Sequence, residues 1–237
     1  MSDGYEQWQR TIDQAKSDSS WDGYDCGIIQ YVSSFNAHLA PTPGYVSLDW
    51  TLIKAMVWTE AGGPARPAWT TKPMQIGKSS DPGLQALLGG REGGDLIIPP
   101  QYQGTLNLAS AIATPQMNIC AGIAYLLMRF AKFGFETITS GAVTVYVVKP
   151  GDSFDKIAHN NGSTVDTLQR LNPRVVVLKP KQSVNIQKAT QRKKITGWNP
   201  ISTTMIAARY NVGDSRYAQK LDYCLEVIKK VSGRTKC

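Results

Sequence analysis

One carboxylate stands out among the residues that could carry out chemistry. Glu60 lies in the last turn of a helix predicted over residues 49–61, whose apolar residues recur at helical spacing before a Gly-Gly-Pro stop. The helix dipole disfavours a carboxylate at this end, and such locally unfavourable positions are typical of functional sites. Met56 and an aromatic neighbour, Trp58 or Trp69, would desolvate Glu60. Desolvation favours the protonated carboxyl, which is the form a general acid needs.

A cysteine is a second candidate for chemistry. The run Asp25-Cys26-Gly27 is superficially similar to the cysteine motif of wall-cleaving endopeptidases, which also need a base. Neither His38 nor His159 lies in a suitable context, so a buried structural Cys26 is the favoured interpretation. With two histidines and no CxxC pair, the sequence predicts no metal site and no cofactor. Three disulfide pairings stay open, as do free thiols, among Cys26, Cys120, Cys224 and Cys237.

The elements that must position Glu60 are mainly helical. Residues 65–113 are rich in Gly, Pro, Thr and Gln, which predicts loops, a small hairpin and one short helix near residues 83–89. A second long helix is predicted from Thr114-Pro115, a capping residue followed by proline, to Gly134. Its apolar stripe places this helix at the centre of the fold.

The pattern changes at Ala142, where an alternating, β-branched run begins. Residues 143–188 are predicted to form strand, helix, helix and strand, and helices resume after a basic link. The predicted core of this segment is Val145, Val147, Ile157, Ala158, Leu168, Leu171 and Ile186. The expected fold class is α+β, with a discontinuous, mainly helical domain over residues 1–142 and 189–237 and a βααβ module inserted at 143–188.

The inserted segment resembles the LysM family, whose modules bind N-acetylglucosamine-containing glycans such as peptidoglycan and chitin. YVVKPGDSFDKIAHNNGSTVDTLQRLNP followed by LKPKQSVNI covers the whole module, although Lys181 replaces a usual glycine. The resemblance implies a shallow sugar-binding groove between the loop after the first strand and the loop after the second helix. The residues implied are Gly151, Asp152, Ser153, Phe154, Asn172, Pro173 and Val175. Several of them could instead only form turns and caps.

The rest of the chain resembles the superfamily of lytic transglycosylases and goose-type lysozymes at four separated motifs in the correct order. LIKAMVWTEAGG is similar to its catalytic helix, KPMQIG to its substrate-cleft turn, NICAGIAYL to the helix behind the cleft and AARYNVG to its late tyrosine-asparagine-glycine motif. Alanine, and not serine, follows Glu60, and residues 1–45 match nothing specific. The resemblance implies a lysozyme-like domain with Glu60 as catalytic acid and Tyr210 as a second catalytic residue. It implies substrate contacts from Met74, Gln75, Ile76, Asn118 and Asn211.

The type of reaction stays open. A lytic transglycosylase uses the substrate's own hydroxyl and leaves a 1,6-anhydro end, whereas a lysozyme uses water, usually with a second carboxylate to position it. Asp81, Glu92 and Asp95 are candidates for that partner, and none lies in a motif. A helical domain without catalytic activity, which leaves the LysM-like module to bind peptidoglycan, is the non-enzymatic alternative.

The net charge of +8 favours an anionic partner. Peptidoglycan is favoured over nucleic acid because basic residues lie along the LysM-like segment: Lys149, Lys156, Arg170, Lys179 and Lys181.

No apolar run approaches the roughly 20 residues that a bilayer needs, so no membrane insertion is expected. The N-terminal sequence lacks the pattern of a Sec signal peptide. We therefore expect an antibacterial effector of type VI secretion or a phage endolysin that acts in the periplasm or cell wall; an effector implies secretion machinery and a cognate immunity protein as partners.

Overall fold

The computed structural model describes residues 4–77, 82–231, 233–235 and 237. The chain forms two compact units. The helical unit comprises residues 1–132 and 195–237, and the inserted unit comprises residues 133–194. Helices and one two-stranded sheet make up the described elements, which confirms the α+β prediction. Within these residues, no helix has both the length and the apolar character needed to span a bilayer.

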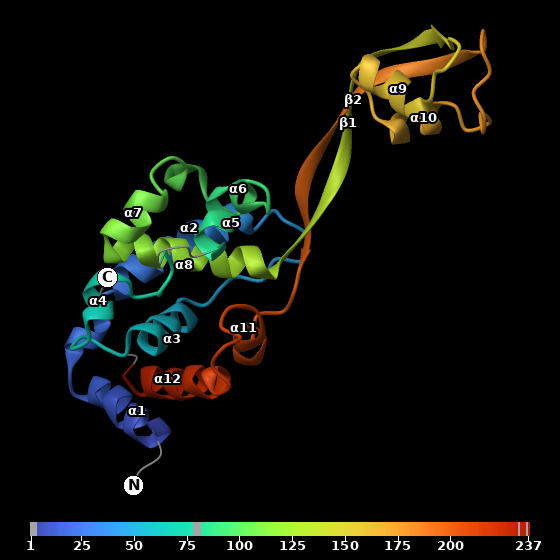
Figure 1. Cartoon of the computed structure of the whole chain (residues 1–237). Helices are drawn as coiled ribbons and strands as arrows, with labels where there is room; N and C mark the ends of the chain where they lie inside the picture. Colours follow the sequence, from blue (N-terminus) through green and yellow to red (C-terminus); the bar gives the residue numbers. More distant parts are fainter. Residues whose placement is uncertain (1–3, 78–81, 232, 236) are drawn as a thin grey trace. The chain divides into compact units, whose positions relative to one another are not determined.

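Four long helices dominate the helical unit, and each is drawn in Figure 1. They are α2 (Asp25–Leu39), α3 (Trp50–Ala61), α8 (Pro115–Phe130) and α12 (Tyr217–Val231). α3 packs against α12 and α2, and α8 packs against α2 and α7. The shorter helices are α1 (Gly4–Asp13), α4 (Pro67–Thr71), α5 (Pro82–Leu88), α6 (Gly94–Ile97), α7 (Leu108–Ala113) and α11 (Thr203–Arg209), with 3-10 turns at Gln14–Lys16, Ser19–Asp22 and Pro100–Tyr102.

α3 forms where the sequence predicts it and carries Glu60 in its last turn. The side chain of Asp49 caps its start by accepting a hydrogen bond from the backbone N–H of Thr51 at 2.9 Å. Gly62 ends it in the left-handed conformation, with φ of 72°, which costs a glycine little. Because both ends are fixed, the position of Glu60 along the helix is fixed as well.

α8 begins at the predicted proline but ends earlier than predicted. The hydroxyl of Thr114 accepts from the backbone N–H of Met117 and caps the start. The helix stops at Phe130, and not at Gly134, because strand β1 (Ala131–Val147) begins at once and pairs with β2 (Ser183–Trp198). Tertiary pairing with a distant strand thus overrides the local helical pattern.

The stretch over residues 65–113 is more helical than the sequence predicts. It holds α4, α5, α6 and α7 together with a 3-10 turn, and of these only α5 matches the predicted short helix. The predicted hairpin is wrong for residues 65–77 and 82–113, the described part of this stretch, since no strand occurs there. Short helices instead provide hydrogen-bond partners for the backbone groups of this stretch. α7, for example, begins with a capping box between Asn107 and Ser110.

The inserted unit has the predicted order of strand, helix, helix and strand. α9 (Phe154–Asn160) and α10 (Val165–Leu171) follow β1 and precede β2 (Figure 1). Ser153 and Thr164 cap the two helices with their hydroxyls. The strands are longer than predicted, so the proposed limits at residues 143 and 188 fall inside them.

The core of the inserted unit contains a register correction. Val145 and Val147, predicted to be buried, are 65% and 54% exposed, whereas Val148 and Val184 are buried with Ile157, Ala158 and Leu168. Ile186 packs partly against this core and Leu171 is only partly buried. Side chains alternate along a strand, so an error of one residue exchanges the buried and exposed faces.

Candidate active site

A cavity of about 370 Å³ lies in the helical unit at the carboxyl ends of α3 and α11. Glu60 comes from α3, and Tyr210 and Asn211 follow directly after α11. The described residues that line this cavity are Glu60, Met74, Gln75, Ile76, Pro82, Gly83, Tyr125, Tyr210 and Asn211. Each of the four motifs in the catalytic resemblance contributes at least one of these residues, so segments far apart in sequence meet here.

Two donors hold one oxygen of Glu60. The hydroxyl of Tyr217 donates to Oε1 at 2.7 Å, and the side-chain amide of Asn211 donates to the same oxygen at 3.4 Å. Tyr217 opens α12 and is only 1% exposed. Sequence reasoning missed Tyr217, although it lies four residues before Leu221 and seven before Cys224 on one helical stripe. That spacing was the available signal.

The protonation of Tyr217 decides the direction of its bond to Glu60. Burial raises the pKa of Tyr217 far above its usual value, and the neighbouring Glu60 carboxylate raises it further. The phenol therefore stays protonated at neutral pH and donates its hydrogen to Glu60. This bond orients the carboxyl group within the cavity.

The turn at Gln75, which lines the same cavity as Glu60, is conformationally unusual. Gln75 has φ of 53°, in the left-handed region that residues other than glycine rarely adopt. Its side-chain amide donates to the carbonyl of Lys72 at 2.8 Å, so the turn is held by its own side chain. Strained backbone of this kind often occurs at functional sites.

Asn118 builds the cavity wall from behind and has no exposed surface. Its amide oxygen accepts from the backbone N–H of Met74, and its amide nitrogen donates to the carbonyls of Ile76 and Ala111, each at 2.9 Å. The predicted substrate contact from Asn118 is therefore wrong: its polar groups are used within the protein, and it is a positioning residue. Gly122, one turn further along α8, leaves room for Met74, whose Cβ would lie 2.7 Å from a Cβ added at Gly122.

The aromatic walls differ from those predicted. Tyr210 donates to the carbonyl of Met74 at 3.2 Å, and its ring lies 5.6 Å from that of Tyr125. Trp58 is fully buried and donates to the carbonyl of Trp21, against which its ring packs edge-on. Trp69 also packs on Trp21. The tyrosines, and not these tryptophans, are the aromatic neighbours of the cavity.

Glu60 is the sole carboxylate among the described residues that line the cavity. Of the three candidates for a second carboxylate, Glu92 and Asp95 are exposed and do not line it. Asp81 lies outside the described residues. The described lining thus offers one acid and several amide and hydroxyl groups, which suits proton donation beside a polar substrate.

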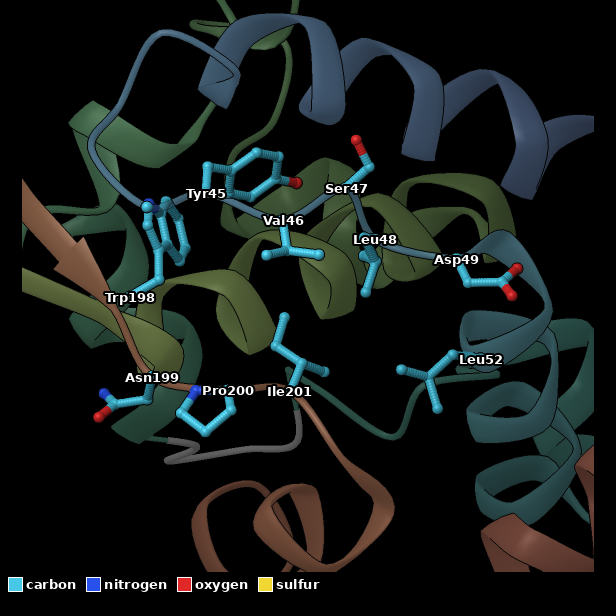
Figure 2. A pocket seen from close by; sticks show the side chains of 11 residues that line it. Tyr45, Val46, Ser47, Leu48, Asp49, Leu52, Trp198, Asn199, Pro200 and Ile201 are labelled. Atoms are coloured by element: carbon cyan, nitrogen blue, oxygen red, sulfur yellow. The ribbon is translucent and has the colours of Figure 1, made fainter.

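A second cavity of the helical unit, of about 480 Å³, lacks this chemistry. Figure 2 shows Val46, Leu48 and Ile201 converging on its centre. Asp49, the carboxylate among its lining residues, caps α3. The lining is mainly apolar, so this larger cavity is not the candidate active site.

The cysteine alternative is contradicted by a disulfide. Cys26 is bonded to Cys237, so its sulfur is not a free thiol nucleophile. The Nε2 atom of His38 lies 3.1 Å from the carbonyl oxygen of Leu96. The described contact of this histidine is therefore with Leu96, and not with Cys26. Cys120 and Cys224 are buried free thiols, and burial raises the pKa of each to about 12.

The first loop of the predicted sugar groove in the inserted unit is a tightly bonded turn. Asp152 accepts from the hydroxyl of Tyr146 at 3.0 Å and from the backbone N–H of Lys149 at 2.7 Å. Ser153 caps α9, and Phe154 packs partly against the core. Gly151 and Ser153 are exposed, so this loop offers mainly backbone to a ligand.

The second loop is anchored by Asn172. Its amide bonds to both the N–H and the carbonyl of Asn185 and to the carbonyl of Leu168, each at 2.8 Å, so it fixes the loop to β2. Because both polar atoms of the Asn172 side chain bond within the protein, the predicted contact of this side chain with the sugar does not fit the structure. Pro173 is exposed and Val175 packs partly on the core. Lys181, at the usual glycine position, has φ of 70°, which explains why a glycine is expected there.

Comparison with protein families matches part of the inserted unit. Residues 146–186 are a LysM domain. The LysM domain indicates peptidoglycan binding and a role associated with the cell wall. It lies within the inserted unit and leaves the helical unit unmatched. No curated protein and no solved structure matches the chain.

Proposed function

We propose that this protein cleaves the glycan strands of peptidoglycan, with Glu60 as general acid and the LysM domain as the part that holds the wall. The observation that carries the proposal is the placement of Glu60 in a cavity where Tyr217 and Asn211 hold its Oε1 atom. A general acid must be held in reach of the leaving oxygen, and two donors on one carboxyl oxygen provide that orientation.

The cleavage step that we propose is protonation of the glycosidic oxygen by Glu60 as the bond to the anomeric carbon breaks. Gln75 and Asn211 lie in the same lining, and their side-chain amide oxygens can accept from the N–H groups of the sugars' N-acetyl substituents. With Glu60 as the acid, attack by the substrate's own hydroxyl would leave a 1,6-anhydro end, and attack by water would leave a reducing end.

The biological setting that we infer is attack on a bacterial wall by an antibacterial effector or a phage endolysin. An effector of type VI secretion would require its secretion machinery and a cognate immunity protein. Expression of the protein in the periplasm of a test bacterium should then cause lysis, and co-expression of the immunity protein should prevent it. Failure of every protein encoded beside it to protect the cells would contradict the effector role.

The direct test is Glu60→Gln, with Glu226→Gln on the exposed side of α12 as matched control. On purified peptidoglycan, Glu60→Gln should lower the release of soluble muropeptides by at least about 100-fold because the transferable proton is lost. Co-sedimentation with peptidoglycan should be unchanged in both variants.

Mass spectrometry of the released fragments distinguishes the reactions. Anhydro ends would support transglycosylation, and reducing ends would indicate hydrolysis by water. Unchanged release by Glu60→Gln would place the acid elsewhere, and cut stem peptides would refute glycan cleavage. Wall binding without any release by the wild-type protein would favour a non-catalytic binding protein that acts through LysM.

A further inference from the structure

A buried charge cluster lies on the helix that carries Glu60. Lys54 of α3 is 2% exposed, and its Nζ atom donates to Asp22 Oδ1 and Asp25 Oδ2, both at 2.7 Å. The side chains of Asp22 and Asp25 are 14% and 3% exposed. Removing one partner of a buried ion pair leaves an uncompensated charge in the interior, so α3 depends on the groups that surround this cluster. Whatever covers this cluster therefore affects the position of α3.

Residues near the C-terminus cover the cluster. The hydroxyl of Thr235 donates to Asp25 Oδ2 at 2.5 Å, and Arg234 Nε lies 3.2 Å from Asp22 Oδ2. The guanidinium of Arg234 also donates to the carbonyls of Ala15 and Lys16. We call Arg234, Thr235 and Cys237 the C-terminal clasp.

One covalent bond holds the clasp in place. Cys237 is bonded to Cys26, which follows Asp25 directly in α2. Both cysteines are exposed, whereas Cys120 and Cys224 are buried free thiols. An accessible disulfide is open to attack by a thiolate, so this pair is the one that a reductant would reach first.

We propose that the Cys26–Cys237 disulfide is a redox switch, which keeps the clasp over the Lys54 cluster and thereby holds α3 and Glu60 in position for glycan cleavage. A dithiol reduces it by giving one hydrogen to each cysteine sulfur and forming its own cyclic disulfide, and a disulfide oxidant reverses the step. Reduction releases the clasp, admits water to Asp22 and Asp25, and loosens α3. The protein is therefore held back in a reducing cytoplasm and fully competent in an oxidising compartment such as the cell wall.

The part of this proposal that concerns cleavage rests on the proposed function, so its test includes readouts that do not need activity. Dithiothreitol should lower the Tm of the full chain by on the order of 10 °C, because the bond closes a very long loop. Tryptophan emission should shift to longer wavelength, since the ring of Trp58 lies 5.3 Å from Lys54 Nζ. Muropeptide release should fall by about tenfold, as expected when a catalytic group moves slightly.

Cys26→Ser should show all these changes without reductant and should no longer respond to it. Thr235→Val, with the disulfide intact, should lower the Tm less than reduction does and should keep the response. Equal Tm and emission in the oxidised and reduced wild type would overturn the proposal, and a fall in Tm with unchanged muropeptide release would overturn control of cleavage. If the oxidised wild type releases nothing, the glycan-cleavage proposal fails, while Tm and emission still decide whether the clasp depends on the disulfide.

Discussion

The two units carry very different charge and reveal their roles in different ways. The inserted unit holds ten Lys and Arg against four Asp and Glu, a net charge of +6, whereas the helical unit, with sixteen against fourteen, has only +2. Adhesion to an anionic wall can be spread over many exposed cations, but proton transfer needs one carboxyl in one orientation. Local sequence therefore identifies the binding unit, whereas the geometry of the candidate active site depends on distant segments brought together.

The largest effect should come from breaking the helical unit alone. Asn118→Ala leaves the N–H of Met74 and the carbonyls of Ile76 and Ala111 buried without their partner, which should cost about 4 kcal/mol of stability. Muropeptide release should be lost while the inserted unit still binds peptidoglycan. Calorimetry and co-sedimentation check this, with Gln116→Ala on the exposed side of α8 as control. Loss of wall binding as well would mean that the units do not fold independently.

The reciprocal change breaks the inserted unit. Leu168→Ala opens a cavity in its small core, where Leu168 is fully buried, and should cost about 3 kcal/mol. Peptidoglycan binding should fall, while cleavage of short soluble glycan fragments should persist because it depends on the helical unit. Gln169→Ala, at an exposed position of α10, is the matched control. Equal loss of both activities would contradict the division of roles.

A smaller effect should follow from Tyr217→Phe, which removes one hydroxyl beside Glu60. The carboxyl loses its 2.7 Å donor, so we expect muropeptide release to fall about tenfold, equivalent to about 1.4 kcal/mol in the barrier, with no change in wall binding. Tyr223→Phe is the control, since Tyr223 lies on the same helix and donates to another carboxylate, Asp13, at 2.8 Å. Equal loss in both variants would indicate a general effect on α12.

The smallest effect concerns pH and the start of α12. Burial opposes ionisation of Asp214, but hydrogen bonds from Lys220 and from the backbone of Arg216 outweigh it and lower the pKa of Asp214. The ion pair should contribute about 0.5–1 kcal/mol. A lowered pKa makes this contribution fully present above the unfolded value of about 4 and lost as pH falls through the folded value. The difference in Tm between wild type and Asp214→Asn should therefore be present at pH 7 and vanish in acid; Asp222→Asn, at an exposed position of α12, is the matched control.

Much of the fold could be predicted where local signals decide it. The capped start of α3, the threonine and proline before α8 and the turns of the LysM domain all follow from neighbouring residues. The errors occur where distant segments decide the outcome. β1 begins at Ala131 because β2 pairs with it, and the exposed face of β1 was assigned one residue out of register.

The same distinction applies to the candidate site. Glu60, Gln75, Tyr210 and Asn211 were predicted by motif, and the structure places them around one cavity. The helical stripe of α12 signals that Tyr217 is buried, but its contact with Glu60 depends on α12 packing beside α3, which the stripe does not report. Asn118 was assigned to the substrate because an amide in a motif can equally bind a ligand or the backbone, and only its burial separates the two.

The chain leaves the helical unit at Lys132 and returns to it beside that point, at Thr196. The hydroxyl of Thr196 donates to the carbonyl of Lys132 at 3.1 Å, so the two ends of the helical unit that flank the insertion are neighbours. A short turn joining them would close the helical unit without stretching its backbone. Replacing the inserted unit by a different adhesion module should then direct the proposed glycan cleavage to another surface.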